Sequence, residues 1–173
     1  MIRLTTPITD ADIEQLRVGE KVLISGTIYT ARDQAHIRLL QESTLPIDVN
    51  GAVMYYVGPT PAREGEPIGA SGPTSSYRMD QLAVPLMEQG LKIMIGKGDR
   101  SKDFQKAMIA NKSVYLMATG GAGALLASRI KASQVILYDD LGPEAIRQLI
   151  VEDFPAFVAY DIYGGNLFQR DRN

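Results

Sequence analysis

The chain has 173 residues, of which 45% are hydrophobic and 22% are charged, a composition typical of a compact globular domain. Its net charge of −2 is too small to attract nucleic acid or an anionic membrane, and it contains no apolar run of about 18 residues that could span a bilayer. The absence of cysteine and the single histidine, His36, argue against disulfides, a thiolate nucleophile and a histidine-based zinc site.

The first half of the chain predicts helices and strands in alternation. The N-terminal stretch MIRLTTPITD lacks the basic-then-apolar pattern of a secretory signal, so we expect a cytoplasmic protein. Asp10 is suited to cap a short helix over DADIEQL. Residues 21–30 have the β-branched content of a strand, and residues 32–41 place apolar side chains at helical spacing. A second strand-like run, residues 52–58, leads into the only long irregular stretch, GPTPAREGEPIG.

The second half predicts short buried strands between helices. The helical candidates are YRMDQLAVPLMEQG, in which Pro85 should kink or interrupt the helix, KDFQKAMIANK and GAGALLASRIK. Near the end, VEDFPAFVAYD suggests two brief strands broken at Pro155. Short apolar runs typical of buried strands occupy residues 91–96, 113–118 and 133–140. We therefore expect one α/β domain over residues 1–173, with a mixed sheet flanked by helices.

Four polar stretches stand where strands, or the long loop, give way to helices. They read TARDQAH, SGPTSSYRMD, GKGDRS and TGGAGA, and three of them carry a cation, namely Arg32, Arg78 and Lys97. In open α/β sheets, ligands bind beyond the carboxyl ends of strands, where helix N-termini present free N–H groups. The four stretches together predict a site for a small anion.

Each of these signals also has a plain structural interpretation. Arg32 could pair with Asp33 on the surface, and Thr74 could be only a helix N-cap. His36 lies on the same helical face as Arg32, which favours an orienting role over that of a proton shuttle. GKG could be an ordinary turn, and the glycines of TGGAGA match neither a Walker A loop nor G-x-G-x-x-G.

Longer motifs, found in order along nearly the whole chain, point to a known family. They are GEKVLISGTIYTARDQAHIRL, GPTSSYRMD, IGKGD, ATGGAGALLASRIK and LGPEAIRQLIVEDFPAFVAYDIYGGNLF. In these motifs the chain resembles the β subunit of the two-subunit iron–sulfur hydro-lyases, the class I fumarase and L-tartrate dehydratase family. GTIYTARDQAH and GPTSSYRMD are the most specific, because neither is a generic turn or cap pattern. The resemblance implies a swivelling β/β/α fold and reversible hydration of a small dicarboxylic acid, with malate and fumarate as the leading pair.

The resemblance also accounts for the missing cysteines. In this family a 4Fe-4S cluster acts as Lewis acid, and its three cysteine ligands belong to the α part of the enzyme. A chain without cysteine would then supply only the other wall of the site. We therefore expect an α subunit carrying the cluster as partner, no metal bound by this chain alone, and self-association, with a dimer as the default.

Residue roles follow from the resemblance at matching positions. Arg32, in the TxRDxAH motif, resembles a substrate-carboxylate ligand, and Lys97 resembles a lysine that contacts the substrate. In GPTxxxRMD, Thr74 is the expected catalytic base and Arg78 a second carboxylate clamp. Planar arginine forks suit this task, because they hold a carboxylate with two hydrogen bonds at a fixed orientation. Supporting roles are expected for Asp33, His36, Ser75 and Asp80.

The substrate and two other functional classes stay open at this point. The run SSY, at Ser75, Ser76 and Tyr77, stands where fumarases tend to have a smaller run, which leaves L-tartrate as an alternative substrate. One other class is a stand-alone anion-binding domain. Another is a different hydro-lyase, related to aconitase or acting on mevalonate 5-phosphate.

Overall fold

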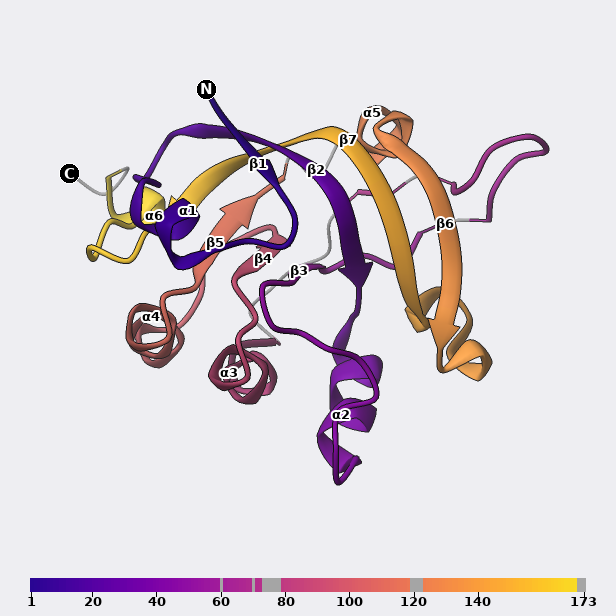
Figure 1. The fold of residues 1–173 in the computed structure, drawn as a ribbon, viewed down its shortest axis with the longest axis horizontal. Helices are drawn as coiled ribbons and strands as arrows, with labels where there is room; N and C mark the ends of the chain where they lie inside the picture. The colour runs from indigo at the N-terminus through magenta and orange to yellow at the C-terminus, as the bar shows by residue number, and fades with distance from the viewer. Residues whose placement is uncertain (60, 70, 73–78, 119–122, 171–173) are drawn as a thin grey trace.

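A single mixed sheet organises the chain in a computed structural model, which describes all residues except 60, 70, 73–78, 119–122 and 171–173 (Figure 1). The seven strands lie in the order β1-β2-β3-β4-β5-β7-β6. Their bounds are β1 Ile2–Thr5, β2 Lys21–Thr30, β3 Val53–Tyr55, β4 Ile93–Gly96, β5 Val114–Met117, β6 Ile130–Leu137 and β7 Ile146–Tyr160. β1 to β5 are parallel, whereas β7 is antiparallel to β2, β5 and β6. The predicted α/β class and mixed sheet are confirmed.

The sheet closes into a small barrel, because β7 pairs with two strands that are not neighbours of each other. One edge of β7 runs along β2, where Lys21 pairs with Phe157 and Thr30 with Arg147. The other edge pairs with β5, for example Leu116 with Val158. The ring β2-β3-β4-β5-β7 is thereby complete, and the inward side chains of these strands form one apolar core. Tyr55 and Phe154 meet edge to face inside it, with ring centroids 5.2 Å apart.

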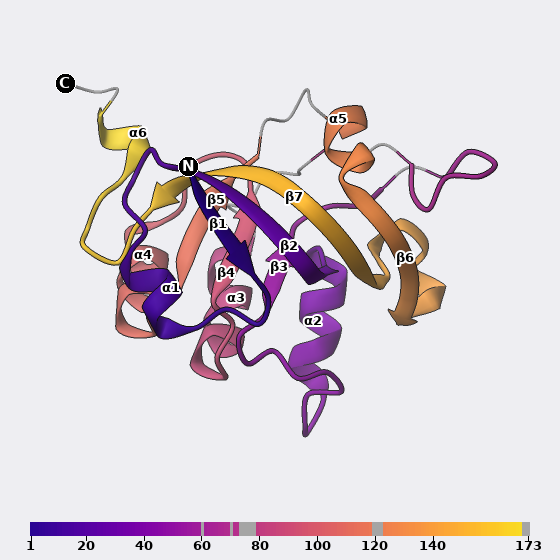
Figure 2. The same cartoon turned by 45° about the horizontal axis from the view of Figure 1, so that its top comes forward.

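Three helices cover the outer face of the parallel strands, as Figure 2 shows. α2 (Asp33–Gln41), α3 (Asp80–Glu88) and α4 (Lys102–Ala110) each follow a polar stretch at a strand end or after the long loop. Their buried side chains form a second core with Met54, Tyr56, Met94 and Tyr115, which point outward from the sheet. The shorter helical elements are α1 (Asp10–Glu14), α5 (Gly123–Ser128), η3 (Asp139–Glu144) and α6 (Leu167–Arg170).

The prediction of two brief strands broken at Pro155 is wrong, because β7 is one strand of 15 residues. Val158 exchanges backbone hydrogen bonds with Gly19 and Glu20 on the β2 side, so by alternation Pro155 presents its nitrogen to the opposite side. On that side β6 pairs with β7 only as far as residue 151 and β5 only from residue 157. Proline therefore loses no ladder hydrogen bond at this position.

Three smaller differences concern the helices and the N-terminus. The cap of α1 is Thr9 rather than Asp10: its side chain accepts from the backbone of Asp12, whose carboxylate accepts from the backbone of Thr9 in return. α3 is not interrupted at Pro85, because burial of its apolar face against the sheet outweighs one lost backbone hydrogen bond. β1, which the sequence did not indicate, forms by parallel pairing with β2.

Candidate functional site

The carboxyl ends of four parallel strands form one edge of the sheet. Thr30 of β2, Tyr55 of β3, Ile95 of β4 and Leu116 of β5 lie in one row across the hydrogen-bonded ladders. Arg32 and Lys97 each follow this row by two residues, and neighbouring strands are about 4.8 Å apart, so their backbones lie on the order of 10 Å from each other. The structure thus brings two predicted substrate-binding residues to the same edge.

Arg32 occupies the N-cap position of α2 and directs a quarter-exposed side chain toward the long loop. Its backbone is extended, and it makes no side-chain capping bond, so the guanidinium is not used to hold the helix. Gly58 leaves room for it, because a side-chain carbon there would lie only 3.2 Å from Arg32 Nη1. Arg32 is therefore held at the strand end by its main chain, with its cationic group at the surface of the site.

Glu144 stands beside Arg32, although sequence reasoning did not identify it. Its Oε1 lies 3.9 Å from Arg32 Nε, beyond hydrogen-bond distance, and Arg32 Nε has no hydrogen-bond partner among the described residues. Burial raises the pKa of Glu144, and the nearby Asp33 carboxylate raises it further, while the charge of Arg32 acts in the opposite sense. Sequence analysis did not connect Glu144 with Arg32, because Glu144 lies in η3, far from Arg32 along the chain. Its position within the motif LGPEAIRQLI was the only hint.

His36 is fully buried beneath Arg32. Its Nδ1 lies 2.7 Å from the carbonyl oxygen of Arg32, which also accepts the His36 backbone N–H at 3.0 Å. A carbonyl can only accept, so Nδ1 carries the proton, and the ring packs edge to face on Tyr56 with centroids 5.6 Å apart. Burial, together with the charge of Arg100, lowers the pKa of His36 to about 4, although the Arg32 carbonyl and Asp33 act in the opposite sense. A neutral ring pinned in this way fits the orienting role predicted for it.

We expect the His36 ring to remain neutral from pH 8 to pH 5. It is the only histidine, so its ring proton signals can be followed by NMR without ambiguity. The unfolded chain takes up this proton near pH 6.5 and the folded chain only near pH 4, so stability is complete above pH 6.5 and is lost as pH falls toward 4. The loss amounts to about 3 kcal/mol, measurable as the pH dependence of urea midpoints. It should disappear in His36→Asn, whereas a wild-type ring titrating near pH 6.5 would contradict the assignment.

Lys97 is exposed and lies on a turn that is held by hydrogen bonds from two buried tyrosines. It directly follows the last residue of β4, and Gly98 adopts a φ of +86°, a region that favours glycine. Tyr115 donates its hydroxyl to the carbonyl oxygen of Gly98 at 2.9 Å, and the Tyr160 hydroxyl donates to Asp99. The turn therefore presents a lysine at the surface from a firmly anchored backbone.

Of the motif GPTSSYRMD, only the flanks can be placed. Thr74, Ser75 and Arg78 lie outside the described residues. Asp80 is the first residue of α3, is buried, and accepts hydrogen bonds from the α4 side with both carboxylate oxygens. On the other flank, the Tyr55 hydroxyl donates to the carbonyl oxygen of buried Ser71, whose own N–H donates to Gly123 at 3.1 Å. The segment thus begins and ends at well-anchored residues.

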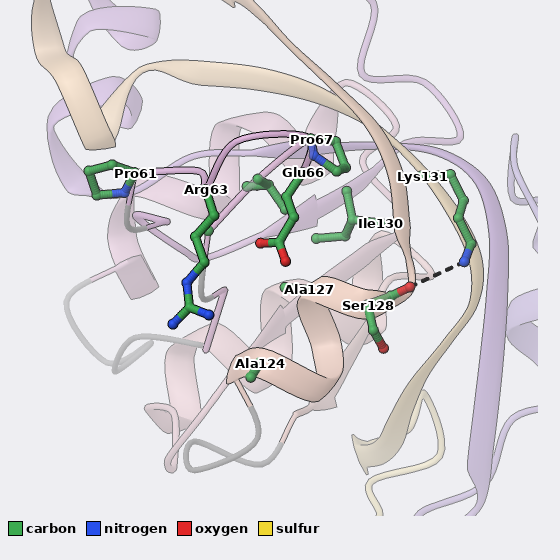
Figure 3. Close-up of a pocket in the computed structure, with 11 residues that line it drawn as sticks. Pro61, Arg63, Glu66, Pro67, Ala124, Ala127, Ser128, Ile130 and Lys131 are labelled. Carbon is green, nitrogen blue, oxygen red and sulfur yellow. Dashed lines mark hydrogen bonds between the residues drawn. The ribbon is translucent and has the colours of Figure 1, made fainter.

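A separate cavity of about 450 Å³ lies between the loop of residues 58–69 and α5 (Figure 3). Arg63 and Glu66 line it from the loop, and Ser128 lines it from α5, where its carbonyl oxygen accepts from Lys131 Nζ at 3.2 Å. None of the predicted site residues that the structure describes lines this cavity. Ala124, from the stretch TGGAGA, also lines it.

Neither a metal-ligand cluster nor a membrane-spanning helix occurs in the described part of the chain. No three His, Asp or Glu residues gather there as metal ligands do, and no helix is long and apolar enough to cross a bilayer. The full sequence contains no cysteine, so its donor set does not fit the thiolate ligation of an iron–sulfur cluster.

Known proteins resemble this chain over nearly its full length. Its residues 1–171 match the family model described as Fumarase C-terminus. It is 37% identical over 166 residues to the aerobic class I fumarate hydratase of Escherichia coli K12, covering 92% of this chain and 30% of that protein. It is 30% identical over 175 residues to the L(+)-tartrate dehydratase subunit beta of the same organism, covering 98% of this chain and 87% of that protein. The chain thus spans about a third of the class I fumarate hydratases it matches. It belongs to the Fumarase C-terminus family.

Proposed function

We propose that this chain, as one domain over residues 1–173, is the β subunit of a two-subunit 4Fe-4S-dependent hydro-lyase. The reaction is the reversible hydration of a small unsaturated dicarboxylic acid, with fumarate and malate as the leading pair. The observation that carries the proposal is the match along residues 1–171 to a family whose members include both fumarate hydratases and separate β subunits of similar length. The cationic strand-end edge supports it.

In this proposal the chain's own residues bind and orient the dianion. Arg32 and Arg78 each hold a carboxylate through a planar fork, and Lys97 adds a point charge from the end of β4. Removal of a proton next to a carboxylate builds further negative charge, so fixed cations stabilise the transition state more than the bound substrate. Thr74 is the proposed acceptor of that proton. Supporting roles are proposed for Asp33, His36, Ser75 and Asp80.

The cluster and its ligands are assigned to an α subunit. The class I fumarate hydratases are about three times as long as this chain, so the remaining two thirds have room for the cluster domain. The β subunit of L(+)-tartrate dehydratase, by contrast, has nearly the length of this chain and by its name works with another subunit. A homodimer and a cytoplasmic location stay predictions from the sequence.

Reconstitution tests this proposal directly. The pure chain should fold, show no hydratase activity and hold no stoichiometric iron after anaerobic reconstitution, because it offers no thiolate ligands. Co-expression with the proposed cluster-bearing α subunit should give activity on fumarate, malate or a tartrate, assayed in parallel. A stable 4Fe-4S spectrum from this polypeptide alone would contradict the assignment.

Two outcomes of the same assay support the alternatives. L-tartrate as the preferred substrate would identify a tartrate dehydratase, which the match to a β subunit of that enzyme favours. If no cluster-bearing partner can be found and the free chain binds small dicarboxylates, it is a stand-alone anion-binding domain.

A further inference from the structure

Arg100 is a fully buried arginine whose function the predicted site does not explain. It lies between β4 and α4, with none of its side chain exposed. Its Nε donates to Asp80 Oδ1, and the other carboxylate oxygen, Oδ2, accepts the backbone N–H of Ser101 at 2.7 Å. The ion pair therefore joins the first residue of α3 to the beginning of α4.

Aromatic rings surround the guanidinium. Its central carbon lies 3.6 Å from the ring centroid of Phe104, 4.9 Å from that of Tyr115 and 5.3 Å from that of Tyr56. These rings fix the plane of the cation, an arrangement open to arginine and not to lysine. A buried ion pair is weak evidence for a contribution to stability, since apolar residues of similar volume often serve as well. The geometric precision of the pair requires another explanation.

Both partners stand next to predicted substrate-binding residues. Asp80 follows Arg78 by two residues, and Arg100 follows Lys97 by three. The backbone N–H of Arg100 also donates to the Tyr160 hydroxyl at 2.7 Å, which anchors the Lys97 turn at its far end.

We propose that Asp80 and Arg100 are positioning residues that fix the Lys97 turn relative to the first turn of α3, the helix that follows Arg78 in the sequence. The inference rests on the proposed function, in which these two cations bind one dianion. The pair is neutral overall, so it sets the spacing of the cations without adding charge to the site. A displacement of about 1 Å at a binding group can cost up to about 100-fold in rate.

The test is the double variant Asp80→Asn/Arg100→Met, assayed in the reconstituted complex. Asparagine keeps an acceptor for the Ser101 N–H, while methionine removes the charge and fills the space, so the fold should survive. We expect kcat/KM to fall by about 10- to 100-fold, mostly through a higher KM, with a melting temperature close to wild type. The matched control is Glu14→Gln/Lys112→Met, which removes an exposed 2.9 Å ion pair and should leave both constants unchanged.

Two further measurements keep the test decisive. If the double variant does not fold, Arg100→Lys replaces it in the test. This variant retains the charge but loses the stacked planar guanidinium, and should raise KM about tenfold. In the free full-length chain, amide hydrogens of residues 97–101 should exchange faster in either variant than in wild type, whatever the reaction proves to be. A wild-type complex inactive on every dicarboxylate would overturn the proposed function alone. Wild-type kinetics and exchange in the folded variants would overturn the positioning role.

Discussion

Replacing Arg32 by lysine should lower kcat/KM of the reconstituted complex by roughly 10- to 150-fold. A hydrogen bond to a charged group is worth about 1.5–3 kcal/mol, and lysine keeps the charge while losing the two-pronged contact. The pairing with Glu144 is loose, because its Oε1 lies 3.9 Å from Arg32 Nε, beyond hydrogen-bond distance. Arg32→Met, which also removes the charge, should lose more. The same reasoning applies to Arg78.

Arg38→Lys provides the control from the same helix. Arg38 pairs with Asp140 of η3 at 2.7 Å on the exposed side of α2, where an ion pair contributes less than about 1 kcal/mol. Its replacement should leave the kinetics unchanged. If Arg32 only pairs with Glu144, Arg32→Lys should lower the melting temperature by a few degrees and preserve kcat/KM. Measuring both quantities for both variants separates the two roles.

Thr74→Val should reduce kcat by about 10²- to 10⁴-fold, the usual contribution of a positioned general base. Valine has the shape of threonine without the hydroxyl, so KM should change little if the side chain acts mainly in proton removal. Thr74→Ser keeps a hydroxyl and should restore most of the rate.

Thr44→Val, an exposed threonine in the connection after α2, is the matched control and should have wild-type kinetics. A Thr74→Val enzyme with near-normal kcat would assign the proton transfer to another group. A large loss in Thr74→Ser as well would point to a steric requirement at this position and away from a hydroxyl base.

Local pattern predicted most strands and helices, because each depends on neighbouring residues, although Ile130 and Lys131 of the predicted helix GAGALLASRIK belong to β6. The β-branched run from Lys21 to Thr30 is a strand over the expected residues, and the helical spacing in DQAHIRLLQ buries Ala35 and Leu39 as it should. Leu40, another apolar residue of this predicted helix, is instead exposed. The strand ends then placed Arg32 and Lys97 at one edge, since parallel strands share their carboxyl ends.

The features that the sequence did not predict depend on contacts between distant parts of the chain. β7 continues through Pro155 because neither β6 nor β5 pairs with β7 at this residue, on the side that the proline nitrogen faces. The local sequence does not contain that information. Glu144 and Arg100 were missed for the same reason. Each acquires its place only when the sheet brings η3 against α2, or α3 against α4.

Closure of the barrel by β7 has a consequence for the order of folding. The ring includes β2 and is completed only by residues 146–160, so a nascent chain cannot close it until β7 has been synthesised. Until then β2 and β5 present unpaired edges, the kind of surface on which chains aggregate. Long-range pairings of this kind also slow folding. β7 therefore covers the edges of two of the parallel strands whose carboxyl ends form the predicted site.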